Sequence, residues 1–192
     1  MRAEDAFQHE DERRAKAAQG GQRTERKRIP WFKIQVNESA KIRFLGELSS
    51  GIGLWRHNRD SKPFSVSCFS NEEYSGAGAE CPFCEEGSRK SVEYFWPVYN
   101  YTTQQVELLS FKDTSFTPVA MLRAFYEENQ TVRDRDFTIR RMPASRNPES
   151  GRSATSYMAI PNAPTNFLVT NLSVPTDDEV IEYLRPFVPK NG

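Results

Sequence analysis

Short stretches in which apolar and polar residues alternate run through most of the chain from residue 31 to residue 160. In the clearest of them, Ala40, Ile42 and Phe44 share one side of an extended strand, and the residues between them point to the other side. Strands are therefore expected at residues 31–36, 40–45, 92–101, 105–111, 136–141 and 155–160, with a strand over 46–56 interrupted by glycines. The first two strands would form a hairpin.

Two segments have helical rather than strand periodicity. Residues 118–129 repeat apolar residues every three or four positions, after Thr117 as an N-cap and Pro118 in the first turn. A second helix is expected to start at Thr176, because Thr176 and Glu179 have the spacing of a capping box.

The aromatic strand over residues 92–101 has two faces. Alternation assigns Tyr94, Trp96 and Val98 to the core. The opposite face then carries Phe95, Tyr99 and Tyr101.

The elements together predict a mainly β fold: an OB-fold-like small barrel, closed or partly closed, with a loop insertion and one or two short helices. Residues 1–28 lack Ile, Leu and Val and are expected to form a flexible charged arm. Residues 29–172 would form the core, with the inserted loop at 57–87, and residues 173–192 a C-terminal helix and short tail.

Composition narrows the class of protein. The chain has 192 residues, 26 Lys and Arg against 26 Asp and Glu, and 12% aromatic residues. No apolar run approaches the roughly 20 residues of a membrane-spanning helix, and the first residues contain no apolar signal segment. Three cysteines are too few for a disulfide scaffold, so we expect a reducing cytosol.

The strongest chemical signal is a metal-ligand set. All three cysteines, Cys68, Cys81 and Cys84, lie in one window with His57, which is the one histidine outside the arm. Three thiolates and one imidazole complete a tetrahedral shell, which indicates one structural Zn²⁺ that orders the loop. The alternatives are a Cys81–Cys84 redox pair, although no βαβ context is visible, or unconnected buried thiols; His9 is the one substitute for His57.

Basic and aromatic residues accompany this loop and recur near residues 133–152. Cationic groups along a phosphate backbone and aromatic faces for the bases are what a single-strand groove requires. Such aromatic residues are also common in cores, and Asp134 and Asp136 could pair with the neighbouring arginines. The candidate DNA-binding residues are Trp55, Arg56, Arg59, Tyr99, Tyr101, Arg133, Arg135, Arg140, Arg146 and Tyr157.

The ligand order from His57 to Cys84, inserted between barrel strands, resembles the zinc-binding OB-fold single-stranded DNA-binding proteins of tailed phages, the group of the T-even helix-destabilising proteins. The blocks at residues 31–45 and 136–157 look similar to that group, and the likeness covers roughly residues 29–172. It implies sequence-tolerant coating of single-stranded DNA in phage replication, recombination and repair. It also implies cooperative contacts between copies through a basic arm, contacts with phage replication proteins, and a place in the cytoplasm of the infected host. The chain departs from the group in lacking a long acidic C-terminal run.

We therefore expect a non-enzymatic single-stranded DNA-binding protein. The alternative is a zinc-stabilised protein-interaction module that regulates host machinery. An enzyme such as a nuclease is disfavoured, because the acidic residues are scattered rather than clustered.

Overall fold

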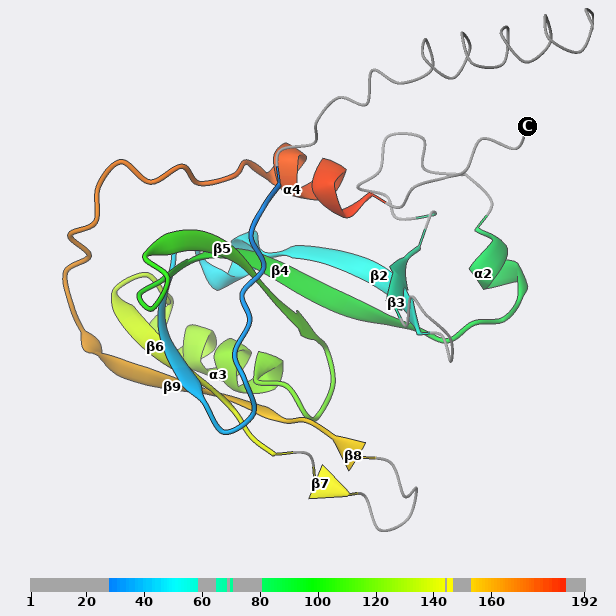
Figure 1. Ribbon diagram of the computed structural model, residues 1–192, viewed down its shortest axis with the longest axis horizontal. Helices are drawn as coiled ribbons and strands as arrows, with labels where there is room; N and C mark the ends of the chain where they lie inside the picture. The colour runs from blue at the N-terminus through cyan, green and yellow to red at the C-terminus, as the bar shows by residue number, and fades with distance from the viewer. Residues whose placement is uncertain are drawn as a thin grey trace, which may run out of the picture.

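The computed structural model describes residues 28–58, 65–68, 70, 81–143, 145–146 and 153–185 (Figure 1). The main element is a seven-stranded antiparallel sheet. Its strands are β1 (Ser39–Phe44), β2 (Ile52–Asn58), β3 (Ser65–Ser67), β4 (Lys90–Asn100), β5 (Gln105–Lys112), β6 (Arg135–Arg141) and β9 (Tyr157–Pro164). The mainly β fold class predicted from alternation is confirmed.

Smaller elements complete the described part of the chain. The strands β7 (Ser145–Arg146) and β8 (Ser153–Ala154) form a separate pair. The helices are α2 (Pro82–Glu85), α3 (Val119–Asn129) and α4 (Asp177–Leu184), with a 3₁₀ turn η1 (Leu48–Ser50). No helix in the described ranges is long and apolar enough to cross a membrane.

The long strand β4 organises the sheet. Along one edge it pairs with β5 over its length, and along the other it pairs first with β2 and then with β1. The strand order is β3-β2-β4-β1-β6-β9, with β5 attached to β4. No pairing among the described strands joins β9 to β3 or β5, so the sheet is open. The expected OB-type barrel is not confirmed, because the outer described strands do not pair with one another.

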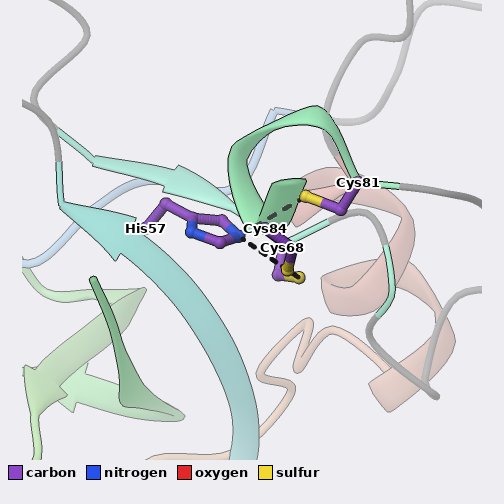
Figure 2. Close-up of side chains that lie close together, drawn as sticks. All are labelled: His57, Cys68, Cys81 and Cys84. Atoms are coloured by element: carbon purple, nitrogen blue, oxygen red, sulfur yellow. Dashed lines mark hydrogen bonds between the residues drawn. The ribbon is translucent and has the colours of Figure 1, made fainter. Parts of the chain in front are cut away.

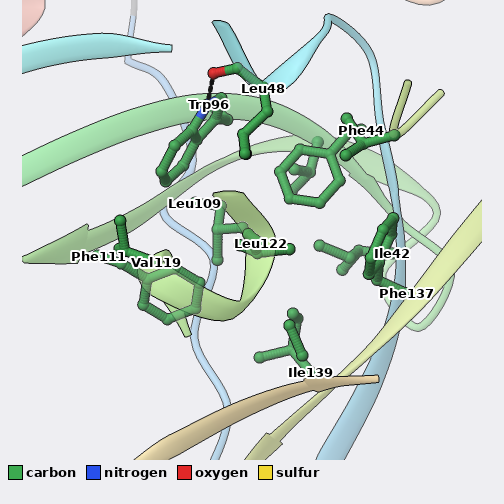
Figure 3. Packing of buried hydrophobic residues seen from close by; sticks show 13 residues of the cluster. Ile42, Phe44, Leu48, Trp96, Leu109, Phe111, Val119, Leu122, Phe137 and Ile139 are labelled. Carbon is green, nitrogen blue, oxygen red and sulfur yellow. Dashed lines mark hydrogen bonds between the residues drawn. The ribbon is translucent and has the colours of Figure 1, made fainter. Parts of the chain in front are cut away.

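The helix α3 covers one face of this sheet and closes the first core (Figure 3). Phe137 lies between Phe44 and Phe125, with ring centroids 5.3 and 5.4 Å apart in edge-to-face geometry. The buried members of this core are Ile42, Phe44, Leu48, Trp96, Val98, Leu109, Phe111, Val119, Leu122, Val132, Phe137, Ile139 and Ala159. Trp96 and Val98 thus take the core positions that alternation predicts.

A second core lies on the opposite face of β2, β4 and β5. There Leu54, Phe95 and Leu108 are fully buried beneath Val180 and Leu184 of α4. Figure 1 shows α4 along this part of the sheet. Phe95 therefore lies on the face predicted for it, but α4 removes that part of the face from solvent.

Residues 31–36 do not form the predicted strand. Trp31 makes one parallel bridge to Leu108, and the chain is held there by hydrogen bonds from Phe32 N to Leu108 O and from Leu108 N to Pro30 O. The side chain of Trp31 packs on Phe95 and donates a hydrogen bond from Nε1 to the hydroxyl of Tyr183. Trp31 packs on the second core and Phe32 and Ile34 on the first, so the segment lies along β5 instead of forming a hairpin with β1.

The predicted broken strand over 46–56 is divided between η1 and β2. The helix predicted at 118–129 is present as α3, but Thr117 does not cap it. Its hydroxyl donates instead to the carbonyls of Lys112 and Thr114, and Pro118 stands at the N-cap without a side-chain hydrogen bond. The capping box of Thr176 and Glu179 is confirmed, since both of its hydrogen bonds form.

Candidate metal centre and aromatic surfaces

The four predicted metal ligands converge in the structure. His57 lies on β2, Cys68 directly follows β3, and Cys81 and Cys84 lie at the start of and within α2. Their ligand atoms all lie within 4.8 Å of one another, and the side chains point toward a common centre (Figure 2). Three separate segments of the chain therefore form one cluster that could hold a metal ion.

Three distances between ligand atoms of the cluster are similar. The Nε2 atom of His57 lies 3.4 Å from Cys81 Sγ and 3.6 Å from Cys84 Sγ, and Cys68 Sγ lies 3.6 Å from Cys84 Sγ. His57, Cys68 and Cys81 are buried, whereas Cys84 is exposed. The cluster thus has one side at the protein surface.

The orientation of the His57 ring suits a ligand. Its Nδ1 lies 3.3 Å from the carbonyl oxygen of Ser88. Because a carbonyl can only accept, Nδ1 carries the proton and Nε2 keeps its lone pair directed at the sulfurs. The ring is fully buried and lies 5.6 Å from the ring of Phe83. These contacts hold the imidazole in the tautomer and rotamer that metal coordination needs.

The short helix α2 presents the last two sulfurs. Pro82 begins the turn, and the amides of Cys84 and Glu85 both donate to the carbonyl of Cys81. Gly87 follows in the left-handed region, with φ of 69°, where a residue without Cβ is favoured. This turn sends the chain to Ser88, which contacts His57, so the Cys-x-x-Cys segment and the histidine are joined through one tight turn.

The Cys84 thiol resists ionisation in this cluster. Desolvation, followed by hydrogen bonding and charge interaction with Cys68 and Cys81, raises the pKa of the Cys84 thiol to about 11. A bound cation offsets such repulsion, because its positive charge favours the thiolate form of each ligand.

Trp55, a predicted DNA-binding residue, lies beside this cluster. Its side chain is 45% exposed, and the ammonium of Lys90 lies 5.3 Å from the ring centroid. The backbone amide of Cys68 donates to the carbonyl of Trp55 at 2.8 Å, and His57 pairs in register with Lys90. Trp55 therefore lies two residues from the ligand His57 on β2, and its carbonyl is bonded to the amide of the ligand Cys68.

The Arg56 side chain is half-buried and contacts neighbouring strands. Its guanidinium donates to Ser67 Oγ at 3.0 Å and to Ser65, and it lies 3.4 Å from a carboxylate oxygen of Glu93. Arg56 thus ties β3 to β2. The predicted residue Arg59 lies outside the described residues.

Tyr99 and Tyr101 belong to an aromatic cluster on the face of the sheet opposite to Trp55. Tyr99 is only 6% exposed, and the ring of Phe167 lies 5.5 Å from Tyr99 and 6.5 Å from Tyr101. The ammonium of Lys41 lies 4.7 Å from the Tyr101 ring. The Tyr99 ring is therefore packed inside the protein, and base stacking by both tyrosines stays a prediction.

Beneath this cluster lies a charged network that the sequence did not indicate. Arg43, only 1% exposed, donates to Asp136 Oδ1 at 2.6 Å and also to the carbonyl of Arg133 and to Thr165. Tyr101 donates its hydroxyl proton to Asp136 at 2.8 Å. The register pair of Arg43 with Asp136 across β1 and β6 could have revealed the contact only once that pairing was known.

The network shifts two pKa values. Burial alone raises the pKa of Asp136, but hydrogen bonds from Lys41, Arg43 and Tyr101 outweigh it and hold that pKa below the usual range. Desolvation and the neighbouring Asp136 carboxylate raise the pKa of Tyr101 to about 12.

The remaining candidates are distributed over other surfaces. Arg133 is exposed at a cavity of about 470 Å³, and Arg140 is exposed on β6. Arg135 forms a two-point ion pair with Asp134 and lies over the Phe125 ring. Tyr157 is half-buried against Phe111, 5.4 Å between ring centroids. Arg146 lies in β7, and its side chain is outside the described part of the chain. Among the candidates whose side chains are described, Trp55 and Tyr99 lie on different faces of the sheet, so these residues do not form one surface.

Comparison of the chain with models of protein families, with curated proteins and with solved structures finds no match.

Proposed function

We propose that the chain is a zinc-stabilised, non-enzymatic module that binds single-stranded DNA with little sequence specificity. One observation carries this proposal: the exposed Trp55 lies beside the cation of Lys90 on backbone that the metal cluster anchors. Arg89, next to Lys90, is also exposed. An exposed indole with cations around it offers a stacking face for any base and charge for the phosphates.

Zinc is the metal that best suits the cluster. Bonds of about 2.3 Å to sulfur and about 2.0 Å to nitrogen put tetrahedral ligands about 3.8 Å apart for two sulfurs and about 3.5 Å apart for sulfur and nitrogen. The separations of 3.6 Å between sulfurs and of 3.4 and 3.6 Å to His57 are close to these values. Four protein ligands leave no position for water, so the ion would be structural.

In this function the protein would coat and protect single strands during DNA replication, recombination and repair. The resemblance of the ligand order to phage proteins supports that role, as does the basic and aromatic surface beside the metal. Contacts between neighbouring copies on one strand, and with replication proteins in the host cytoplasm, are part of the same proposal.

The test is titration of a fluorescent oligo(dT) at several salt concentrations. We expect binding that weakens steeply with salt, because neutralised phosphates release counterions. Trp55→Ala should weaken binding about tenfold, since stacking is worth about 1–3 kcal/mol per base. The matched control is Phe116→Ala, at a 43% exposed ring elsewhere on the protein. Absent or salt-insensitive binding by the wild-type protein would contradict the proposal.

A second candidate function rests on a different surface. Met158 and Ile160 of β9 are 39% and 42% exposed, in register with Arg140 and Thr138 of β6. Apolar side chains left uncovered on a sheet face suit contact with a protein, which favours the interaction module as the alternative. Capture of a host protein by a chain that binds no oligo(dT), abolished by Ile160→Lys, would select this function instead.

A further inference from the structure

A cavity of about 210 Å³ opens between η1, α3 and the β4 strand, and we refer to it as the η1–α3 slot. Its floor is formed by two aromatic rings, Tyr94 and Trp96, whose centroids are 5.7 Å apart at an interplanar angle of 26°. Trp96 is fixed in place, because its Nε1 donates to the carbonyl of Leu48 at 3.0 Å. Trp96 is only 4% exposed, so the surface that a ligand can reach in the slot is mainly the half-buried ring of Tyr94.

The floor depends on a glycine. A Cβ atom on Gly51 would come within 2.1 Å of Trp96 Nε1, so no other residue fits against the indole in this position. Gly53 faces Tyr94 in register, and a Cβ there would lie 3.0 Å from the tyrosine ring. Gly51, just before β2, and Gly53 within it thus allow the aromatic rings of β4 to lie directly against the backbone.

The mouth of the slot carries a positioned cation. The guanidinium of Arg123 lies 5.1 Å from the centroid of Tyr94, and its Nη2 atom donates to the Tyr94 hydroxyl at 2.7 Å and to Asp113 at 2.9 Å. At another wall, the hydroxyls of Ser49 and Tyr126 lie 3.3 Å apart. A planar ring bound in the slot would have the hydroxyls of Ser49 and Tyr126 at its edge. The Arg123 guanidinium would lie near the group attached to the ring.

The slot is in line with Trp55. Gly53 and Trp55 share one side of β2, with the register pairs Gly53↔Tyr94 and Trp55↔Val92, and Gly51 directly precedes the strand. Residues two apart on a strand are about 6.6 Å apart, so the path from Trp55 to Tyr94 is a short step along one face. Because Gly53 has no side chain, nothing from β2 stands between the two rings.

We propose that the η1–α3 slot holds one unstacked base of a bound single strand, continuing the path that begins at Trp55. The proposal rests on the single-stranded DNA-binding function. The base lies against the accessible part of the Tyr94 ring, its edge meets the hydroxyls of Ser49 and Tyr126, and Arg123, held beside Tyr94, faces the phosphate side.

Nuclear magnetic resonance of the full, metal-loaded chain tests this directly. Oligo(dT) should shift the backbone amide signals of Gly51, Gly53 and Val119, because ring stacking changes the local magnetic field around these residues. Thymidine 5′-monophosphate serves as the second probe. If the mononucleotide alone produces these shifts and oligo(dT) does not, the slot is a nucleotide site and not part of a strand path, which overturns the proposal.

A filled slot gives an independent test. Ser49→Phe places a ring in the cavity from an exposed position and should weaken oligo(dT) binding about tenfold, within the range expected for one stacked base. Ser173→Phe, at an exposed serine outside the slot, is the matched control and should bind as the wild type does. Unchanged binding by Ser49→Phe, together with unshifted glycine amides in bound wild type, would overturn the slot and leave the proposed function standing. Failure of the wild type to bind oligo(dT) at all would instead overturn the function.

Discussion

At the scale of single residues, Arg43 and Asp136 form an ion pair inside the sheet. Both are almost fully buried, at 1% and 2% exposure, and their atoms approach to 2.6 Å. The pair is satisfied on all sides, because Arg43 also donates to Arg133 O and Thr165 and Asp136 accepts from Tyr101. Such a pair adds little net stability when complete, but removal of one charge leaves the other buried without compensation.

The residue change that tests this is Asp136→Asn. We expect the free energy of unfolding to fall by about 3 kcal/mol, because the buried Arg43 charge then lacks its partner. Urea denaturation monitored by tryptophan fluorescence measures the change. Glu128→Gln, at an exposed carboxylate of α3, should stay within about 0.5 kcal/mol of the wild type. An equally small effect of Asp136→Asn would show that the pair is not a structural determinant.

The same carboxylate predicts an acid dependence of stability. The pKa of Asp136 is lowered in the folded protein, so its contribution is fully present above its unfolded pKa of about 3.9 and is lost as pH falls through the folded pKa. Urea unfolding at pH 7, 4 and 2.5 should show a steep loss below pH 4 in the wild type. Asp136→Asn should show a smaller loss over the same interval, and equal slopes for both proteins would refute the assignment.

At the scale of elements, the metal cluster joins the paired strands β2 and β3 to the short helix α2. His57 belongs to β2, Cys68 directly follows β3, and Cys84 lies in α2. The neighbouring residue Ser67 donates to the carbonyl of Leu184 at the end of α4. The cluster therefore connects this end of the sheet to the helix that covers the second core.

Replacement of one ligand should destabilise this end of the sheet. Cys81→Ser is expected to lose bound zinc, melt at a lower temperature and bind oligo(dT) more weakly, because Trp55 shares backbone with the cluster. Elemental analysis, thermal melting and the DNA titration measure the three effects. Glu86→Gln, an exposed change in the same turn, should keep the zinc. Full zinc content and unchanged melting in Cys81→Ser would show that the four residues do not act as one site.

The helix α4 depends on its capping box. Thr176 Oγ1 accepts from the amide of Glu179, and the Glu179 carboxylate accepts from the amide of Thr176. Thr176→Ala should destabilise the protein by about 1 kcal/mol in urea denaturation, since one amide at the helix start loses its partner. Thr170→Ala, at an exposed threonine before the helix, is the control. Equal stability of the two variants would mean that packing alone holds α4.

At the scale of the whole molecule, net charge says little about DNA binding. The chain carries 26 basic and 26 acidic residues, yet the surface beside the metal cluster presents Arg89 and Lys90 next to an exposed indole. Phosphates respond to the local arrangement of cations, while the overall sum governs only the long-range field. A neutral protein can therefore bind a single strand through one basic surface.

The salt dependence of binding should report that surface. If Lys90 contacts a phosphate, Lys90→Gln should reduce the slope of log K against log salt by about 0.7, the value for one phosphate of a single strand. Titrations of oligo(dT) at four or more salt concentrations give the slope. Lys33→Gln, at an exposed lysine away from Trp55, should leave it unchanged. Identical slopes in both variants and in the wild type would place the phosphates elsewhere.

Much of the local structure follows from sequence pattern. The alternation of strands β1, β4 and β6, the capping box at Thr176 and the ligand set from His57 to Cys84 were all predicted, because each depends on neighbours within a few residues or on residue types with few other uses. A cysteine cluster with one histidine is such a case, since thiolates favour metal ions over most other partners.

The tertiary structure decided what pattern could not. Phe95 is buried because α4 covers its face, Trp31 packs on Phe95 instead of continuing a strand, and Arg43 meets Asp136 across 93 positions of sequence. The pairing of β2 with β4 also places Trp55 and Tyr99 on opposite faces of the sheet. The η1–α3 slot opens on the face that carries Trp55. The sequence by itself determined most of the strands, the capping box at Thr176 and the Cys and His set, which are local or chemically distinctive. Only the folded chain decided which faces stay open, because exposure depends on elements that are far apart in sequence.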